Sequence, residues 1–313
     1  MFSSPFSNAL VLTGPTGSGK SELGVELAEK LDADIISMDS MALYRGMDIG
    51  TAKPGADLRQ RVPHHLLDVR EPWESASVAW WLNEAAHCVR LIESRNKRAL
   101  LVGGTPLYLK ALIYGLFDGP PADLELRRRL TDESQQAGAQ ALHERLAKLD
   151  PAAAKRLHPN DVRRIIRALE VLELTGRPLS DWQQQWKAEP PNEHTANVES
   201  PPQILWLDLP RAELYARIDA RVGQMMKAGL LDEVRQLRAL PHPVSREAAQ
   251  ALGYKELFAY LEGQSSLEEA IVRIQTRSRN FAKRQITWFR HLPNCRPVTR
   301  ELTFTLWGSK MKC

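Results

Sequence analysis

A glycine-rich run near the start of this chain constrains its fold more than any other feature. The run matches the phosphate-binding pattern G-x-x-x-x-G-K-[S/T] and consists of Gly14, Pro15, Thr16, Gly17, Ser18, Gly19, Lys20 and Ser21. An apolar segment at residues 9–12 precedes it, and leucines at 23, 27 and 31 follow with helical spacing. Strand, glycine turn and helix start form the context in which this pattern binds a di- or triphosphate.

Each residue type in the run suits an anionic ligand. Glycines let the backbone approach a phosphate closely, and the amide N–H groups at the helix start then face it. Lys20 adds a positive charge, and the Ser21 hydroxyl can hold Mg²⁺. The alternative is a glycine-rich turn followed by a helix that happens to carry a lysine. The pattern does not identify which di- or triphosphate binds.

Length and composition allow a large core and indicate two domains. The chain has 313 residues and a formal net charge of +4. Cys88, Cys295 and Cys313 form no C-x-x-C pair, which is typical of a reduced cytoplasmic protein rather than of a disulfide or zinc framework. We expect no secretory signal, because the apolar segment at residues 9–12 is short and follows no basic segment. No stretch approaches the roughly 20 apolar residues that span a bilayer, so we expect no membrane partner.

The order of predicted elements divides the chain into three segments. Strands are predicted at residues 9–12, 33–38 and 99–102 and a helix at 80–94, the alternation of a parallel α/β sheet. After a break at 118–121, residues 122–186 are helical and charge-rich, and a proline-marked connection follows at 190–202. A further strand at 204–209 precedes helices at 211–240, 246–261 and 267–290. We predict an α/β fold: a P-loop NTPase-like parallel sheet core at 1–118, an inserted all-helical domain at 119–200, and completion of the core with C-terminal helices at 201–313.

Polar residues follow the predicted strands. Ligands bind at the carboxyl ends of parallel strands, and three strands here run into the glycine-rich run, into Asp39, and into a Gly-Gly sequence followed by Thr105. Asp39 can bind Mg²⁺, act as a general base beside the phosphate site, or cap the next helix. Thr105 precedes Pro106 and can cap a helix with proline at its first position, which is compatible with a ligand contact.

These motifs together resemble a known family. Besides residues 14–21, they are Asp39 with Ser40 and the segments 44–54 (YRGMDIGTAKP), 62–66 (VPHHL), 103–105 (GGT), 253–255 (GYK) and 283–288 (KRQITW). The set resembles the bacterial tRNA dimethylallyltransferases, or tRNA adenosine-37 isopentenyltransferases, over nearly the whole chain. The phosphate motif alone is unspecific, whereas its combination with residues 44–54 and 283–288 is specific. Many relatives carry Ala and Thr where this chain has Gly17 and Ser21, which preserves a small residue and a hydroxyl.

The resemblance implies a reaction. The family transfers a dimethylallyl group from dimethylallyl diphosphate to N6 of adenosine 37 in tRNA, so residues 14–21 would bind a diphosphate leaving group rather than ATP. Lys20, together with Mg²⁺ held by Ser21, would neutralise charge as the C–O bond breaks. The exocyclic amine of adenine is a poor nucleophile, and the resemblance assigns removal of its proton to Asp39.

Further roles also come from the resemblance. Thr16 is similar to a diphosphate or Mg²⁺ contact of the family, and Thr105 to a ligand near the substrate base. An arginine, either Arg217 or Arg221, would cap the diphosphate. The two arginines are four residues apart on one helical face, so the sequence leaves the choice between them open.

Basic residues gather in two places. Residues 273–290 carry arginines and lysines and no acidic residue, and Arg163, Arg164 and Arg167 form a second cluster. A solvated helix face is the ordinary explanation of one such run. The interleaved aromatic residues Trp288 and Phe289 more often pack in a core than stack on bases. Two runs together with the resemblance favour RNA binding.

The resemblance implies contact with the anticodon stem-loop of tRNA. Adenosine 37 is stacked there, so an enzyme must extrude it to reach N6. By resemblance, the extruded base and the prenyl diphosphate enter one channel from opposite ends and the helical insert closes over the RNA. The residues carried over as tRNA contacts are Asp39, Ser40, Met41, Ala42, Thr105, Arg127, Arg163, Arg164, Ile165, Ile166, Arg167, Gln250, Ala251, Leu252, Gly253, Tyr254, Lys255, Lys283, Arg284, Gln285, Ile286, Thr287, Trp288, Phe289 and Arg290.

Two other functions fit part of the sequence. A nucleotide or small-molecule kinase would use ATP in the same loop, with the helical insert as a lid, whereas the transferase would not need ATP. A non-enzymatic RNA-binding protein with a nucleotide switch would explain the basic clusters, and it predicts that Asp39→Ala leaves cellular function intact. Nothing in the sequence demands more than a monomer.

Overall fold

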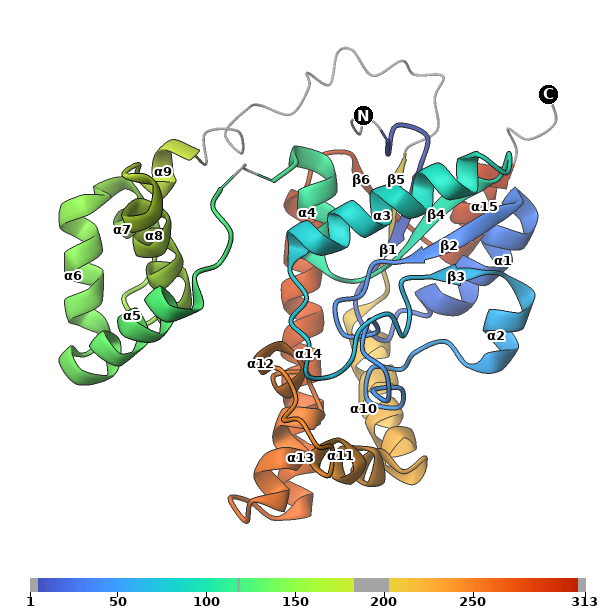
Figure 1. Ribbon diagram of the computed structural model, residues 1–313. Coiled ribbons are helices and arrows are strands. Elements are labelled where there is room, and N and C mark those ends of the chain that lie inside the picture. Colours follow the sequence, from blue (N-terminus) through green and yellow to red (C-terminus); the bar gives the residue numbers. More distant parts are fainter. Residues whose placement is uncertain (1–4, 117–118, 183–202, 309–313) are drawn as a thin grey trace. The chain divides into compact units, whose positions relative to one another are not determined.

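Apolar segments from distant parts of the chain form one parallel sheet. The computed structural model describes residues 5–116, 119–182 and 203–308, and all statements below concern these residues. Six strands of this part are β1 (Leu10–Thr13), β2 (Ala33–Ser37), β3 (His64–His65), β4 (Arg98–Gly103), β5 (Ile204–Leu207) and β6 (Cys295–Val298). They lie in the order β3-β2-β4-β1-β5-β6, and every neighbouring pair is parallel (Figure 1). The predicted α/β fold is therefore confirmed.

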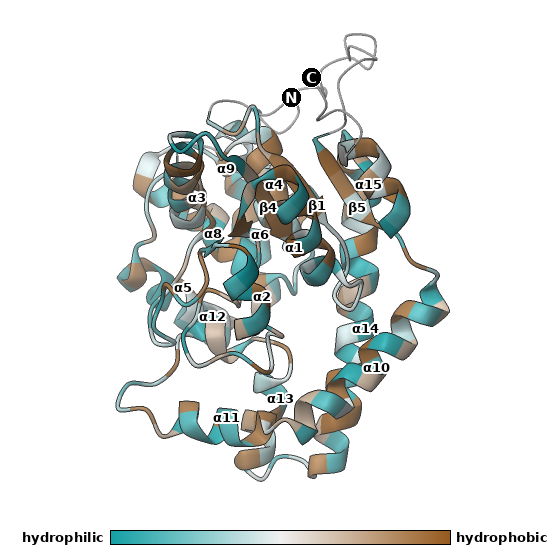
Figure 2. Ribbon diagram, turned by 90° about the vertical axis from the view of Figure 1, so that its right-hand side faces the viewer, coloured by the Kyte–Doolittle hydropathy of each residue, from teal (hydrophilic) through white to brown (hydrophobic). Residues whose placement is uncertain are grey.

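The central strands are buried on both faces, which explains why they were predictable. β1, β2 and β5 have no exposed residue, as expected for strands of a parallel sheet that helices cover on both sides. β5 pairs with β1 through Val11 and Ile204, so the chain returns to the same sheet after the helical segment. The hydropathy colouring shows apolar residues concentrated on these strands (Figure 2).

Two edge strands were not predicted. β3 contains only His64 and His65, and in β6 three of the four residues, Pro297 among them, are not buried. Short or proline-containing strands at sheet edges lack the apolar run that identifies a buried strand. Their pairing partners, β2 and β5, therefore determine their conformation.

Helices cover the sheet and extend from it. In chain order they are α1 (Lys20–Leu31), α2 (Ala56–Arg61), α3 (Val78–Glu93), α4 (Pro106–Tyr114), α10 (Arg211–Lys227), α11 (Leu230–Arg238), α12 (Arg246–Ala249), α13 (Tyr254–Leu261), α14 (Leu267–His291) and α15 (Arg300–Gly308). α1 and α15 pack on one face of the sheet, and α3 and α4 lie over the other (Figure 1). α10 and α14 run side by side away from the sheet, with α11 and α13 at their far end.

Glycines divide two helices that were predicted as continuous. The predicted helix at 211–240 is α10 followed by α11, and the break contains Gly229 at φ 99°. The predicted helix at 246–261 is α12 followed by α13, with Gly253 at φ 90° between them. A left-handed backbone ends a helix and is accessible to glycine at little cost. The long helix predicted at 267–290 is confirmed as α14.

The chain divides into two compact units, Met1–Ile113 with Asn197–Cys313, and Tyr114–Ala196. The second unit contains α5 (Leu124–Ala137), α6 (Ala139–Leu149), α7 (Pro151–Arg156), α8 (Val162–Thr175) and α9 (Leu179–Trp182), around a core of its own that includes Leu130, Leu146 and Ile165. The predicted connection at 190–202, residue 118 of the predicted break and the helical prediction at 183–186 lie outside the described residues. Nowhere in the described part is a helix both long and apolar enough to cross a membrane.

Candidate active site

A pocket of about 620 Å³ lies where the central strands end. Its walls come from the glycine-rich loop after β1, the segment after β2, the end of β4, residues 51–55, and helices α10 and α14. Every lining residue belongs to the unit that holds the sheet. This is the edge at which parallel α/β sheets bind ligands.

The loop after β1 has the backbone of a phosphate-binding loop. Gly17 and Gly19 have φ angles of 83° and 82°, a left-handed conformation that other residues rarely adopt. Gly19 is the N-cap of α1, and no side chain caps that helix. The backbone N–H groups in the first turn of α1 therefore face the loop, and no capping side chain accepts a hydrogen bond from them. Helix N-termini of this kind attract anions.

Lys20 is a partly buried cation in this loop. Its Nζ donates to the Pro15 carbonyl at 3.4 Å. Burial lowers the pKa of Lys20 from 10.5 to about 8, partly offset by Asp39, while Arg221 lowers it further. A partly buried ammonium whose charge is this costly is stabilised by an arriving anion, so Lys20 favours binding of a phosphate group.

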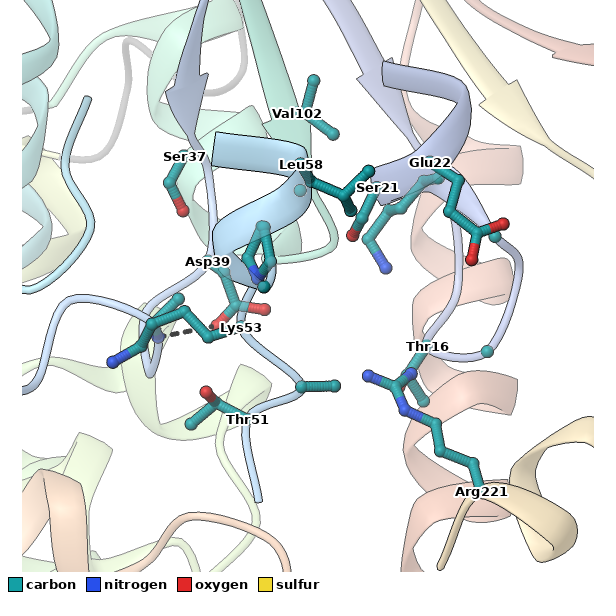
Figure 3. A pocket seen from close by; sticks show the side chains of 18 of the residues that line it. Thr16, Ser21, Glu22, Ser37, Asp39, Thr51, Lys53, Leu58, Val102 and Arg221 are labelled. Carbon is teal, nitrogen blue, oxygen red and sulfur yellow. Dashed lines mark hydrogen bonds between the residues drawn. The ribbon is translucent and has the colours of Figure 1, made fainter. Parts of the chain in front are cut away.

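Asp39 faces the pocket from the segment after β2. Its Oδ1 accepts hydrogen bonds from the N–H groups of Met41 at 2.9 Å and Ala42 at 3.4 Å, which fix the carboxylate in place. Figure 3 shows this carboxylate and the Arg221 guanidinium pointing into the pocket from opposite sides. The carboxylate is thus held within the same cavity as the phosphate-binding loop.

Thr105 supports the Asp39 segment. Its Oγ1 accepts a hydrogen bond from the Ser40 N–H at 3.1 Å, and its own N–H donates to the Met38 carbonyl at 3.3 Å. It directly precedes Pro106, the first residue of α4, as predicted for a capping position. Thr105 does not line the pocket.

The two candidate arginines of α10 have different surroundings. Arg221 Nη1 donates to Thr16 Oγ1 at 3.5 Å, and burial lowers the pKa of Arg221 while Asp39 opposes that shift. Arg217 forms an ion pair with Glu213 at 2.7 Å and its side chain is half-exposed. Both line the pocket, but only Arg221 is hydrogen-bonded to the phosphate-binding loop in the described structure.

An apolar wall completes the pocket. Ile35, Leu58, Leu67 and Val102 lie among its lining residues, and Leu58 and Val102 are visible beside Ser21 in Figure 3. Apolar side chains next to a phosphate-binding loop suit a ligand that joins a hydrocarbon group to a phosphate. The sequence analysis did not identify this wall, because its residues come from two strands, one helix and one loop.

Lys53, in segment 44–54, has a structural role. Lys53 Nζ donates to the Tyr44 carbonyl at 2.7 Å and forms ion pairs with Asp48 and Asp68, both at 2.5 Å, and its side chain is only 1% exposed. All three donors of the ammonium are therefore used within the protein. Lys53 borders the pocket without being available to a ligand.

A buried glutamate holds the loop that borders the pocket. Glu233 accepts hydrogen bonds from the N–H groups of Asp48 at 2.9 Å, Ile49 at 2.8 Å and Gly50 at 3.2 Å, and from the Tyr254 hydroxyl at 2.5 Å. Burial and the Glu233 carboxylate raise the pKa of Tyr254. No local sequence pattern indicates this contact, because Glu233 and Asp48 are 185 positions apart in the chain.

The structure separates the predicted tRNA contacts by burial. The side chains of Ala42, Ile165, Ile166, Ala251, Tyr254, Gln285 and Phe289 are buried. Exposed side chains among the predicted contacts are those of Arg163, Arg164, Gln250, Lys255, Lys283, Arg284, Thr287, Trp288 and Arg290. The remaining ones are partly buried, apart from the buried Gly253. The RNA contacts of all these residues stay predictions. For the residues with buried side chains, the prediction is that RNA contacts the chain segment around them and not the side chain itself.

Two of the predicted tRNA-contacting arginines stabilise a buried carboxylate. The Glu170 carboxylate is fully buried and forms ion pairs with Arg127, at 2.8 Å from Nε to Oε1, and with Arg167, at 2.7 Å from Nη1 to Oε2. These bonds lower the pKa of Glu170 against the effect of burial. Arg163 and Arg164 of the same unit remain on its surface, and Arg164 pairs with Asp161 at 3.0 Å.

Comparison with known proteins assigns the chain to a family. Residues 42–292 match the family model described as IPP transferase. A tRNA dimethylallyltransferase of Geobacter sulfurreducens is 47% identical over 285 residues, which cover 91% of this chain and 89% of that protein. A solved tRNA isopentenylpyrophosphate transferase of Bacillus halodurans is 40% identical, with a TM-score of 0.65 and coverage of 94% and 90%. A eukaryotic dimethylallyltransferase acting on tRNA is 28% identical, with a TM-score of 0.72 and coverage of 97% and 76%. This chain therefore belongs to the IPP transferase family.

Proposed function

We propose that this chain transfers the dimethylallyl group of dimethylallyl diphosphate to N6 of adenosine 37 in tRNA, which gives N6-isopentenyladenosine and releases diphosphate. The relatives named above are tRNA dimethylallyltransferases. The observation that carries the proposal is one pocket in which a phosphate-binding loop, a fixed carboxylate and an apolar wall converge. These are the groups that a prenyl diphosphate and an attacking amine require.

The donor would bind with its two ends on different walls of the pocket. The diphosphate would lie against the N-terminus of α1, Lys20 and the Ser21 hydroxyl, and the dimethylallyl group against Leu58 and Val102. Of the two candidate arginines, Arg221 is the one we assign to the diphosphate, because its partly buried guanidinium is hydrogen-bonded to Thr16. Partial burial reduces the screening of its charge by water, which strengthens its attraction to a nearby diphosphate.

Asp39 would act on the acceptor. As the C–N bond forms, the N6 amine would lose a proton to the Asp39 carboxylate, and the electron pair of the breaking C–O bond would pass to the diphosphate. The hydrogen bonds from Met41 and Ala42 hold the carboxylate in one orientation, so no reorganisation is needed during the step. Thr105 would act through its hydrogen bond to Ser40, which positions the same segment.

The residues of the pocket fit a magnesium ion. No group of three or more His, Cys, Asp or Glu side chains that could hold a metal occurs in the described part of the chain. Mg²⁺ usually takes one or two protein oxygens and completes its shell with phosphate oxygens and water, so the Ser21 hydroxyl suffices as a protein ligand and Asp39 stays available as the base. We assign the ion to Ser21, where it would offset the charge that develops on the departing diphosphate.

The acceptor would be the anticodon stem-loop. The exposed basic residues of α14 and α8, including Lys283, Arg284 and Arg163, would contact its phosphates. Extrusion of adenosine 37 would bring N6 to Asp39. We propose that the protein acts as a monomer, because no step of the proposed reaction calls for a residue of a second copy.

The mass of a short RNA tests the whole proposal. An unmodified anticodon stem-loop with adenosine 37 is incubated with the protein, Mg²⁺ and dimethylallyl diphosphate, without ATP. We expect a gain of one five-carbon prenyl unit, and no gain when adenosine 37 is replaced by guanosine. Omission of Mg²⁺ with a chelator present should abolish the gain.

Failure to modify the RNA would favour a different enzymatic function. No gain of mass, in the absence and in the presence of ATP, would contradict the transferase. A screen for ATP turnover against small acceptors would then test the kinase hypothesis, which the phosphate-binding loop alone also allows.

A further inference from the structure

Gln285 of α14 joins two segments of the diphosphate site. Its Oε1 accepts a hydrogen bond from the Thr16 N–H of the phosphate-binding loop at 2.9 Å, and its Nε2 donates to the Gly104 carbonyl at 2.6 Å. The residue is 2% exposed, and it lines the pocket. Both ends of the side-chain amide are thus used, one on the loop after β1 and one just beyond β4.

The absence of a side chain at Gly104 makes room for this amide. A Cβ added at Gly104 would lie 2.6 Å from Gln285 Nε2, 3.0 Å from the Gly14 carbonyl oxygen and 3.4 Å from Lys20 Cε. The glycine therefore lets the amide lie directly on the backbone beside the lysine of the phosphate-binding loop. Sequence analysis placed Gln285 among the tRNA contacts, whereas its burial directs it to this loop.

The tip of the phosphate-binding loop is held by two neighbouring helices. Gln285 of α14 binds the backbone of Thr16, and Arg221 of α10 binds the Thr16 hydroxyl. α10 also touches the loop through Ile218, which leaves only 3.0 Å for a Cβ at Gly17. Leu214 and Ile218 of α10 form a core cluster with Ala282 of α14, so the two helices act as one support.

We propose that Gln285 is a positioning residue of the diphosphate site. It fixes Thr16 and Gly104 relative to each other, and so sets the shape in which the loop binds a diphosphate. It does so from the helix whose exposed face carries Lys283, Arg284 and Arg290, so the predicted RNA-contacting helix and the diphosphate loop are joined by one side chain. The inference rests on the proposed function of the pocket as a diphosphate site.

Binding of inorganic pyrophosphate with Mg²⁺, measured by calorimetry without RNA, tests the inference. Gln285→Leu keeps the approximate size of the side chain and removes both hydrogen bonds. We expect the dissociation constant for pyrophosphate to rise about 10- to 100-fold, because a buried N–H and a buried carbonyl lose their partners and the loop loses its anchor. The KM for dimethylallyl diphosphate should rise with it, while the affinity for the anticodon stem-loop alone stays unchanged.

A second variant and a control make the result decisive. Gln285→Met is similar in length and also removes both hydrogen bonds without adding a charge, so pyrophosphate binding should weaken again. Gln275→Leu changes a glutamine on the same helix whose amide donates to the Asp219 carbonyl at 3.5 Å, away from the phosphate-binding loop, and it should bind pyrophosphate like the unchanged protein.

The outcomes separate this inference from the proposed function. Normal pyrophosphate affinity in either folded Gln285 variant overturns the positioning role and leaves the proposed function intact. A loss of thermal stability with an unchanged pyrophosphate affinity would show a purely structural role and also overturns it. Absence of pyrophosphate binding by the unchanged protein would instead remove the diphosphate site itself.

Discussion

Asp39 is the residue on which the proposed reaction depends most directly. Its carboxylate is fixed by two backbone N–H groups and faces the pocket. Asp39→Ala should lower kcat by ~10²–10⁴, the usual contribution of a general base, with little change in RNA affinity. Single-turnover measurements of prenyl transfer beside RNA-binding titrations check both parts. An unchanged rate would remove Asp39 from the mechanism.

Lys20 should make diphosphate binding depend on pH. Burial lowers the pKa of Lys20 to about 8, so the free protein carries this charge below about pH 8 and loses it above. Pyrophosphate affinity should therefore fall as the pH rises through about 8. Lys20→Met should bind weakly throughout and show no such step, which also controls for protonation of pyrophosphate itself. The same pH profile in both proteins would contradict the role of Lys20.

The two arginines of α10 should differ in effect. Arg221→Ala removes a partly buried charge beside Thr16, and we expect kcat/KM for dimethylallyl diphosphate to fall by about 10²-fold or more. Arg217→Ala removes a half-exposed side chain that is paired with Glu213, and its effect should be at least tenfold smaller, because exposed ion pairs are screened. Steady-state kinetics of the two variants provide the comparison. A larger loss in Arg217→Ala would reverse our assignment.

At the scale of elements, helix α14 has one face buried in the core and one exposed basic face. Its buried face carries Gln285 and Phe289, and Phe289 packs near Trp206 of β5 with ring centroids 5.9 Å apart. Its exposed face carries basic residues. An amphipathic helix of this kind anchors itself in the core while it presents charge to a partner.

Charge reversal on the exposed face of α14 should weaken RNA binding. The double variant Lys283→Glu with Arg284→Glu should have a higher dissociation constant for the anticodon stem-loop. In a plot of the logarithm of this constant against the logarithm of salt concentration, the slope should fall by about one for each phosphate contact that is lost. Arg90→Glu with Arg95→Glu, at two exposed arginines in and just after α3, is the control with the same change of charge. Unchanged affinity and slope would place α14 outside the RNA interface.

At the scale of the whole molecule, the two units should contribute separable functions. The pocket draws its lining only from the sheet-containing unit, and the helical unit has its own core. Arg163→Glu with Arg164→Glu should therefore weaken RNA binding and leave pyrophosphate affinity unchanged. Lys148→Glu with Lys155→Glu, at two exposed lysines of the same unit, is a control with the same change of charge. Parallel titrations with RNA and pyrophosphate measure both, and a change in pyrophosphate affinity would contradict the separation.

The sequence by itself determined the features that depend on neighbours along the chain. The central strands were predictable because they are apolar runs buried on both faces, and α14 because its pattern continues without a glycine. The phosphate-binding loop was predictable because its glycines, lysine and serine are consecutive. Asp39 was a candidate because it directly follows a predicted strand.

Tertiary structure alone decided the features that join distant residues. Gln285 is hydrogen-bonded to Thr16, which is 269 positions away in the chain, and Glu233 to Asp48, which is 185 positions away. No local sequence pattern predicts either contact. The spacing of Arg217 and Arg221 could not separate them, whereas the packing of α10 partly buries one beside the loop and leaves the other half-exposed. The physical reason is that the burial of a side chain and its hydrogen-bond partners depend on residues from other segments. Those residues come together only when the sheet forms and brings the ends of its strands to one edge.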